Sequence, residues 1–313
     1  MPYLKLNDSH QMPMIGLGTL GIVDRNTLRN VIEDGVHVGY RHIDTAYFYK
    51  NEAILGEKLR EIFKRKDHPD HRVKRSEMFV TSKLWNTRHS RFEVIEGLVE
   101  STRKLNIGYL DLYLVHFPMA WQEGGMDIPL DANGLTKDTN ISVVDTWKGM
   151  EDAKRMGMVR SIGVSNFNVD QLTRILIHAA VRPMVNQLEI NPYLTEECLV
   201  RFCQKSGIQV QAYSPFSKGN QTLLNEPVLK KLAFKYHKSV PQVIIRWLLQ
   251  RGIAVIPGTI HKSRLKENID VFDFKLEENE MKRISRLNRN WRRTDLPYSR
   301  FNSEYPYRRM CYE

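Results

Sequence analysis

Hydrophobic and polar positions follow two alternating patterns along nearly the whole chain. Short apolar runs of strand length are each followed by a longer segment in which apolar residues recur at helical spacing. Segment 28–39 shows this spacing at Leu28, Val31, Ile32 and Val36, and segment 92–105 shows it again. Strands that alternate with amphipathic helices are typical of a parallel sheet.

The apolar runs fall at eight places, after an opening segment (4–16) that predicts a β-hairpin. They are MIGLGT (14–19), YRHIDT (40–45), MFVTSK (78–83), LDLYLVH (110–116), RSIGVS (160–165), MVNQLEI (184–190), IQVQAYS (208–214) and AVIPGT (254–259). Eight strand–helix units predict an α/β fold of the closed (β/α)8 TIM-barrel type rather than an open doubly wound sheet. No linker, repeat or low-complexity run interrupts the pattern, so residues 1–313 are expected to form a single domain.

Helix boundaries and loops add detail to this barrel. Ser142 and Thr195 are the predicted N-caps of two helices, and Gly39, Gly157 and Gly207 are expected to end three others. Two segments are longer than a barrel requires: 117–141 and the tail 291–313. Because long loops at the catalytic end of a barrel shape its pocket, we expect both segments over the active-site mouth.

Composition indicates an ordinary globular protein, with 42% hydrophobic residues. The chain opens without the apolar segment of a signal peptide, and no apolar run is long enough to cross a bilayer. Its three cysteines lack the CxxC spacing of a zinc ribbon. These features predict a cytoplasmic protein with no membrane partner.

The formal net charge of +11 raises the question of an anionic partner. Basic residues crowd in segments 60–75 and 282–293, which resemble solvated helix faces or loops and contain no nucleic-acid-binding motif. We therefore expect no nucleic-acid partner. The alternative is that the excess positive charge binds nucleic acid.

Four polar residues stand at or just beyond the ends of apolar runs: Asp44, Tyr49, Lys83 and His116. Each also has an ordinary structural interpretation. Asp44 could cap a helix and Tyr49 could be an aromatic residue at the barrel rim. Lys83 could be a surface charge and His116 a buried histidine whose hydrogen bonds are all made. Burying several such groups costs stability unless they serve chemistry. If the runs are parallel strands, their carboxyl ends bring the four groups to one mouth, where an α/β enzyme has its active site.

Other chemistries have little support in the sequence. The segment GLGTLG (16–21) lacks the spacing of the dinucleotide-binding fingerprint, which argues against a Rossmann domain. No phosphate-binding loop of the Walker type, HExxH motif or EF-hand loop occurs, and His116 has no His or Cys at metal-ligand spacing. No metal site is therefore expected.

Seven separated segments resemble the aldo-keto reductase family, in its aldose and aldehyde reductase branch. They are GYRHIDTAYFYKNE, SKLW, YLDLYLVHFP, SIGVSNF, VNQLEINPY, QAYSPF and residues 256–268. The resemblance implies a barrel whose bottom is closed by an amino-terminal hairpin. It also implies an NADP-dependent carbonyl reductase that converts aldehydes, and by extension ketones, sugars or steroids, to alcohols. The alternative is a cofactor-binding regulatory or scaffold protein of the same fold.

By this resemblance, Tyr49 is the general acid that protonates a carbonyl oxygen while the cofactor delivers hydride. Lys83 is expected to lower the pKa of the Tyr49 phenol, and Asp44 to hold the Lys83 ammonium in place. His116 is expected to donate a hydrogen bond that orients the carbonyl group.

The resemblance also assigns a cofactor site. Its predicted residues are Thr19, Asp44, Ser165, Asn166, Gln187, Tyr213, Ser214, Thr259, Arg264, Glu267 and Asn268. Ser165, Asn166 and Gln187 would bind the nicotinamide carboxamide, and Tyr213 would stack on the ring. Arg264 can pair with a 2′-phosphate, so NADPH is the expected cofactor. Gly258 stands where many NADP-preferring relatives have Lys, so NADH stays possible; Lys262 is either a substitute for that lysine or simply a solvated side chain.

The predicted substrate site is the part of the resemblance that carries over least well from the family to this chain. Its residues are Leu20, Phe48, Tyr49, Trp85, His116, Phe117 and Trp121. Leu20 and Phe117 stand where many relatives have Trp, which predicts a wider pocket with fewer N–H donors. Phe48, Trp85 and Trp121, together with the tail aromatics Tyr298, Phe301, Tyr305 and Tyr307, are expected to compensate. We expect a small-molecule carbonyl substrate and a monomer.

Overall fold

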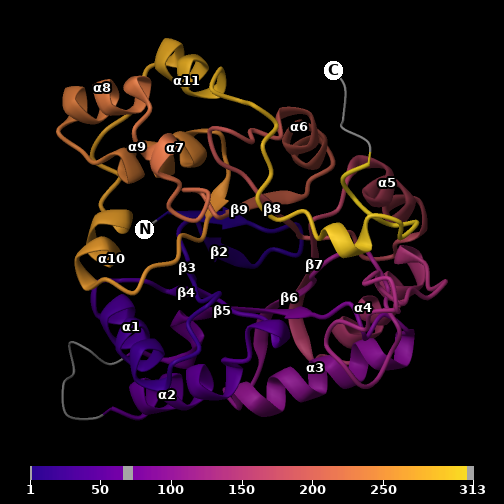
Figure 1. The fold of residues 1–313 in the computed structure, drawn as a ribbon. Helices are drawn as coiled ribbons and strands as arrows, with labels where there is room; N and C mark the ends of the chain where they lie inside the picture. The colour runs from indigo at the N-terminus through magenta and orange to yellow at the C-terminus, as the bar shows by residue number, and fades with distance from the viewer. Residues whose placement is uncertain (1, 66–72, 309–313) are drawn as a thin grey trace.

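A single sheet of eight parallel strands forms the centre of the molecule (Figure 1). The computed structural model describes residues 2–65 and 73–308, so parts of the predicted basic segment 60–75 and tail 291–313 lie outside it. The strands are β3 (Leu17–Gly18), β4 (His42–Asp44), β5 (Phe79–Leu84), β6 (Leu110–Val115), β7 (Val159–Ser165), β8 (Val185–Glu189), β9 (Gln209–Tyr213) and β10 (Ala254–Val255). Each strand pairs in parallel with the next one along the chain.

Hydrogen bonds between the segment before β3 and β10 close the sheet on itself. Ile15 and Val255 form a parallel bridge. The Gly16 N–H donates to the Val255 carbonyl (2.9 Å), and the Val255 N–H donates to the Met14 carbonyl (2.8 Å). The predicted barrel is therefore confirmed, and closure removes both free sheet edges.

The opening hairpin covers the amino-terminal end of this barrel. Strand β1 (Tyr3–Lys5) pairs antiparallel with β2 (Gln11–Pro13), as the opening sequence predicts. The Met12 side chain is fully buried, and it belongs to the same apolar cluster as Leu112, Leu114 and Ala254 from the barrel interior. The hairpin thus seals the bottom with hydrophobic contacts.

Helices surround the sheet in Figure 1 and pack their apolar faces on its outer surface. They are α1 (Arg25–His37), α2 (Glu52–Lys64), α3 (Arg91–Leu105), α4 (Val143–Arg155), α5 (Val169–His178), α6 (Glu197–Lys205), α7 (Gln221–Leu224), α8 (Pro227–Tyr236), α9 (Val240–Gln250), α10 (Lys262–Ile269) and α11 (Glu278–Ser285). Short 3-10 turns lie at Tyr47–Tyr49, Arg75–Glu77 and Pro297–Ser299.

The predicted helix boundaries are mostly correct. Ser142 caps α4, since its hydroxyl accepts from the Asp145 N–H. Gly39, Gly157 and Gly207 follow α1, α4 and α6 with positive φ of 111°, 72° and 73°. The prediction for Thr195 is wrong, because α6 begins at Glu197 and its N-cap is Glu196, in the left-handed region.

The two long segments meet each other at the carboxyl ends of the strands. The Thr136 N–H donates to the Tyr298 carbonyl (3.0 Å), which joins segment 117–141 to the tail. The Glu189 carboxylate at the end of β8 accepts the N–H groups of Arg293 (3.0 Å) and Thr294 (2.8 Å). The tail is thus fixed across the same end of the barrel that carries the predicted site.

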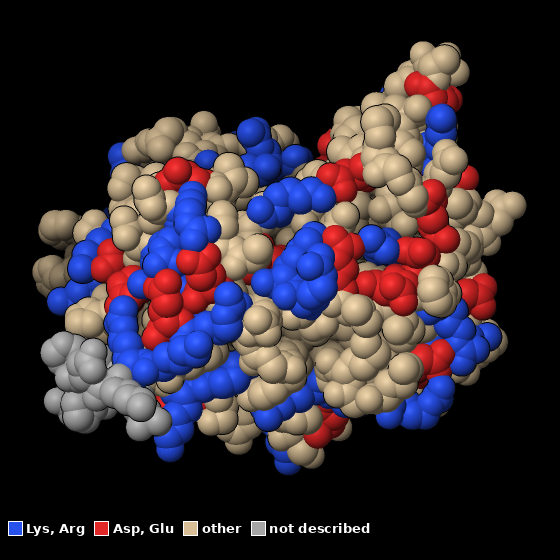
Figure 2. All heavy atoms as spheres, turned by 90° about the horizontal axis from the view of Figure 1, so that it is seen from below, with Lys and Arg blue, Asp and Glu red and all other residues tan. Residues whose placement is uncertain are grey.

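Charges of both signs alternate on the face seen in Figure 2. Part of this pattern comes from α1 and α2, where three arginines pair with three glutamates. The pairs are Arg25–Glu57, Arg29–Glu57, Arg29–Glu61 and Arg65–Glu33. On this face the excess positive charge is interleaved with acidic residues, unlike the continuous basic patch that is typical of nucleic-acid binding.

A glycine in α2 sets the distance between α2 and α3. A Cβ on Gly56 would lie 1.9 Å from the Leu105 carbonyl oxygen. We expect Gly56→Ala to lower the free energy of unfolding by about 1–3 kcal/mol, because the backbone at Leu105 must move to make room for the Cβ. This cost should exceed the gain from the higher helix propensity of Ala. Urea denaturation measures the change. Gly97→Ala in α3 is the control, since its nearest contacts are side-chain atoms of Arg88 and Leu84 that can shift; equal stability of Gly56→Ala and wild type would refute the packing argument.

Candidate active site

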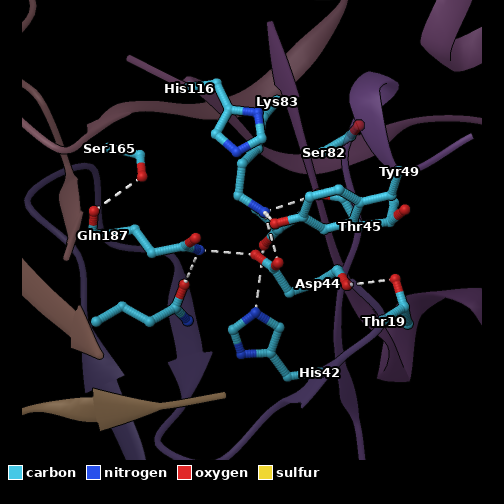
Figure 3. Close-up of polar contacts among 12 residues, drawn as sticks. Thr19, His42, Asp44, Thr45, Tyr49, Ser82, Lys83, His116, Ser165 and Gln187 are labelled. Carbon is cyan, nitrogen blue, oxygen red and sulfur yellow. Dashed lines mark hydrogen bonds and ion pairs between the residues drawn. The ribbon is translucent and has the colours of Figure 1, made fainter. Parts of the chain in front are cut away.

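A buried ion pair lies at the centre of the candidate site (Figure 3). Asp44 ends β4 and Lys83 lies near the end of β5, so neighbouring parallel strands place them side by side. The Lys83 Nζ lies 2.5 Å from Asp44 Oδ1, and both side chains are almost fully buried. Burial alone would lower the pKa of Lys83, but Asp44 and Tyr49 together outweigh it and the pKa is raised. Lys83 is therefore a firmly charged ammonium.

All three N–H groups of this ammonium have acceptors. Besides Asp44, Lys83 Nζ donates to the Thr45 carbonyl oxygen (2.9 Å) and to the Tyr49 hydroxyl oxygen (3.2 Å). Tyr49 is presented by the 3-10 turn that follows β4. Because its oxygen accepts from Lys83, the proton of the Tyr49 hydroxyl is free to be donated elsewhere.

The expected effect of Lys83 on Tyr49 is only partly correct. Lys83 does favour the phenolate, but burial disfavours it more, and the pKa of Tyr49 is raised above its ordinary value. The sequence could not show how deeply the phenol would be buried. Tyr49 is therefore protonated at neutral pH and holds the proton that an acid must donate.

His116, directly after β6, faces this group from the next strand. Its ring lies edge-on to Tyr49, with centroids 5.7 Å apart. Burial and the nearby Lys83 charge hold the pKa of His116 well below its usual range, so the imidazole is neutral. Its Nδ1 is buried without a partner, which leaves Nε2 as the nitrogen available to a ligand. The structure thus brings the four predicted catalytic residues together.

Gln187, on β8, connects the predicted nicotinamide site to the ion pair. Its Nε2 donates to Asp44 Oδ2 (2.7 Å). Ser165 and Asn166 lie beside it at the end of β7, where the Ser165 hydroxyl donates to the Gln187 carbonyl (2.8 Å). The amide oxygen of Gln187 has no donor among the described residues. This oxygen suits the N–H of a carboxamide.

The side-chain amide of Asn166, in contrast, has partners on both its nitrogen and its oxygen. Its Nδ2 donates to the His116 carbonyl (2.9 Å) and to Ser165 Oγ (3.1 Å). Its Oδ1 accepts from the hydroxyls of Tyr213 (2.8 Å) and Tyr307 (3.2 Å). For Asn166 to bind a ligand as predicted, one of these tyrosines must release it. Tyr307 also borders a cavity of about 790 Å³ between α5, α6 and the tail.

The other predicted cofactor residues lie along β3, the loop after β9 and α10. Thr19 is buried and donates from Oγ1 to the Asp44 carbonyl (2.9 Å). Ser214, which follows β9, adopts a positive φ of 48°. Thr259 precedes α10, and Oγ1 of Thr259 accepts from the His261 N–H (3.1 Å). These positions surround the carboxyl ends of neighbouring strands.

Helix α10 carries the last three predicted cofactor residues. Glu267 accepts a hydrogen bond from the Ser239 hydroxyl, and Asn268 is buried. Arg264 is exposed and has no ion-pair partner among the described residues, so its guanidinium is available to a phosphate. Lys262 instead pairs with Asp34 of α1 at 2.7 Å.

Gly258 lies close to the seam where β3 meets β10. A Cβ at this position would lie 3.0 Å from the Gly18 carbonyl oxygen, a tight contact that a shift of a few tenths of an ångström would relieve.

The predicted substrate residues form an aromatic cluster beside His116. Phe48 stacks on Trp85, with centroids 3.9 Å apart, and Trp85 Nε1 donates to the Asp127 carbonyl (2.6 Å). Phe117 stacks on His116 at 5.3 Å. Trp121 is fully buried and contacts Trp85 edge-on at 5.4 Å, so it supports the cluster from behind.

Leu20 and the tail aromatics occupy different positions. Leu20 is 53% exposed in the loop after β3 and is not part of this cluster. Tyr298, Tyr305 and Tyr307 pack against the cluster, whereas Phe301 is 64% exposed. Three of the four tail aromatics therefore lie where compensation was expected.

Three residues that the sequence analysis did not single out also shape the site. Asn51 donates to the carbonyl groups of Thr19 (3.0 Å) and Ile22 (3.2 Å), which fixes the loop after β3. Glu189 fixes the tail, as described above. Gln211 on β9 accepts a hydrogen bond from Gln187. A signal existed for Gln211 and for Glu189, because an amide or a carboxylate inside an apolar strand requires a partner.

Removal of one partner tests the buried ion pair. We expect Lys83→Met to lower the free energy of unfolding by about 3–5 kcal/mol, because Asp44 is left as a buried, unpaired charge. The double variant Asp44→Asn/Lys83→Met should recover part of the loss. Lys262→Met is the matched control, since its pair with Asp34 is solvent-exposed and should cost about 1 kcal/mol or less. Urea denaturation of the four proteins decides.

The same pair predicts a pH dependence of stability. The pKa of Lys83 is raised by folding, so its contribution is complete below the unfolded value of about 10.4 and is lost as pH rises through the folded value. Wild type should therefore lose this stabilisation only in strong alkali, and Lys83→Met should lack that component. Equal pH profiles for the two proteins would contradict the assignment.

Comparisons with known proteins agree with this geometry. The family model described as aldo/keto reductase family matches residues 14–289. Aldose reductase C of Dictyostelium discoideum is 44% identical over 306 residues, which cover 96% of this chain and 94% of that protein. The solved aldose reductase of Schistosoma japonicum superposes with a TM-score of 0.93 at 37% identity, covering 98% of this chain and 99% of that one.

A Bombyx mori aldo-keto reductase solved in complex with NADP is also similar, with a TM-score of 0.88, 39% identity and coverage of 97% and 98% of the two chains. The family match covers most of the chain, and the relatives align over nearly their whole length. The chain therefore belongs to the aldo/keto reductase family.

Proposed function

We propose that this protein is an NADPH-dependent carbonyl reductase that converts aldehydes, and also ketones, to alcohols, with Tyr49 as the general acid. The observation that carries the proposal is the hydrogen bond from the Lys83 ammonium to the Tyr49 oxygen (3.2 Å), inside a buried ion pair. It leaves one proton on Tyr49 to donate and supplies positive charge that stabilises the oxygen once the proton has left.

The chain's own groups account for the proton half of the reaction. A carbonyl oxygen bound near Tyr49 would accept the phenol proton, and the Lys83 charge would stabilise the phenolate that forms. The neutral imidazole of His116 would donate from Nε2 to the same oxygen and orient it. Asp44 keeps Lys83 in position throughout.

Bound NADPH would supply the hydride for the carbonyl carbon. The residues present fit it: Gln187 offers a free amide oxygen for the carboxamide, and Arg264 offers an unpaired guanidinium for a phosphate at the other end. Ser165, Asn166, Tyr213, Ser214, Thr259, Glu267 and Asn268 complete the proposed site. Since Gly258 provides no cation, NADH remains a second cofactor to test.

A regulatory or scaffold role without catalysis is less well supported. Such a role does not require Tyr49, Lys83, Asp44 and His116 to stay assembled, and burying an ion pair with no function is costly. The assembled geometry therefore favours the enzyme.

We further propose that the protein is a single-domain monomer of the cytoplasm and binds no nucleic acid. No helix among residues 2–65 and 73–308 is long and apolar enough to cross a membrane. The interleaved charges on the face seen in Figure 2 argue against a nucleic-acid site on that face.

Removal of the Tyr49 hydroxyl oxygen tests its role as the general acid. Tyr49→Phe should lower kcat for aldehyde reduction by at least about 10²–10⁴-fold, because no other group holds the transferred proton. NADPH binding, followed by tryptophan fluorescence quenching, should be retained. Tyr47→Phe on the same turn is the matched control and should keep nearly full activity. Full activity of Tyr49→Phe would overturn the proposed role.

The pH dependence tests the same group in wild type. Because the pKa of Tyr49 is raised by burial, the rate of reduction should stay flat through neutral pH and fall only in alkali, as the phenol loses its proton. Alcohol oxidation, which needs the phenolate, should rise over the same range. Lys83→Met should move both transitions to higher pH, since Lys83 favours the phenolate. A transition near pH 7 assigned to Tyr49 would be incompatible with this account.

A further inference from the structure

Gln211 lies in the middle of the barrel, below the proposed cofactor site and outside the set of residues predicted to bind it. It is on β9, its side chain is fully buried, and it touches none of the four catalytic residues in the hydrogen bonds of the described chain. Its Oε1 accepts from Gln187 Nε2 at 2.6 Å, and its Nε2 points to the sulfur of Met12 at 3.7 Å.

The orientation of both amides follows from Asp44. A carboxylate only accepts hydrogen bonds, so the Gln187 atom 2.7 Å from Asp44 Oδ2 must be the nitrogen. That nitrogen carries two N–H groups, and the second one needs an acceptor. The Gln211 atom 2.6 Å away must therefore be its oxygen, which turns the Gln211 nitrogen toward the floor of the barrel.

The hydrogen bonds from Asp44 through Gln187 to Gln211 leave one side-chain atom of Gln187, Oε1, without a partner among the described residues. Both N–H groups of Gln187 are used, by Asp44 and by Gln211, and its Oε1 accepts from no described donor. Asp44 already keeps the nitrogen on its side, because a flipped amide would place Oε1 against a carboxylate. Gln211 accepts the second N–H and so fixes the plane of the amide, which leaves Oε1 in one direction for a ligand.

We propose that Gln211 is a positioning residue that fixes the Gln187 amide, so that the site accepts an N–H from the nicotinamide carboxamide and discriminates against pyridine rings that lack one. This inference rests on the proposed function, and it adds a specificity for the carboxamide end of the cofactor. Gln211 itself contacts neither cofactor nor substrate. It acts through Gln187.

The probe pair is NADP⁺ and its 3-acetylpyridine analogue, in which a methyl group replaces the carboxamide NH₂. Wild type should bind NADP⁺ about tenfold more tightly than the analogue, because only NADP⁺ donates to Gln187 Oε1. Gln211→Met and Gln211→Val remove the second acceptor and should lower the ratio of the two dissociation constants severalfold, toward one, because the Gln187 amide can then tilt about its hydrogen bond to Asp44. Gln211→Glu, held as the neutral acid because burial near Asp44 disfavours a second carboxylate, keeps an acceptor oxygen at the same reach and should keep the wild-type ratio. Fluorescence quenching measures binding.

Two controls separate positioning from general damage. Met12→Leu alters the other neighbour of Gln211 and should leave the ratio unchanged. Urea denaturation identifies folded variants, and two apolar replacements are used so that failure of one to fold leaves the other. A merely structural role would weaken both ligands equally and leave the ratio at its wild-type value.

The inference is overturned if folded Gln211→Met or Gln211→Val keeps the wild-type ratio, or if Gln211→Glu loses it as they do. The proposed function fails by a different result: wild type that binds NADPH but reduces no aldehyde. Binding ratios do not depend on turnover, so the two failures are distinguishable.

Discussion

The buried ion pair between Asp44 and Lys83 is the interaction on which the rest of the site depends. Two opposite charges lie 2.5 Å apart in a region that excludes water, where each would be very costly alone. Because the charges sit on adjacent parallel strands, the sheet itself determines their separation. Two further polar residues of the site are attached directly to this pair: Tyr49 on the lysine side, and Gln187 on the aspartate side.

The pair also connects the two halves of the proposed reaction. On one side, Lys83 leaves Tyr49 with a proton to donate and with charge to stabilise its loss. On the other side, Asp44 and Gln211 accept the two N–H groups of Gln187, so its oxygen is the atom left for the proposed carboxamide contact. One carboxylate therefore orders both the proposed acid and the proposed carboxamide contact. Such preorganisation is stable because the surrounding barrel is closed and packed down to Met12 in the floor hairpin.

The sequence predicted the strands, the barrel and the meeting of the four polar groups, because parallel strands bring their carboxyl ends together whatever the details of packing. It did not predict properties that depend on how deeply a side chain is buried. The raised pKa of Tyr49 reflects burial that outweighs Lys83. Trp121 reads as a pocket residue but lies fully buried behind Trp85. The role of Gln211 depends on which amide atom faces which neighbour, and that is set only when β4, β8 and β9 are brought together.

The most direct test of this account is a neutron diffraction map of the deuterated protein at neutral pH, which shows where the protons lie. The account predicts three deuterons on Lys83 Nζ, directed at Asp44, Thr45 and Tyr49, and one deuteron on the Tyr49 oxygen. A neutral Lys83 with its proton on Asp44, or a Tyr49 phenolate, would contradict the proposal that Tyr49 is an acid poised beside a charged lysine.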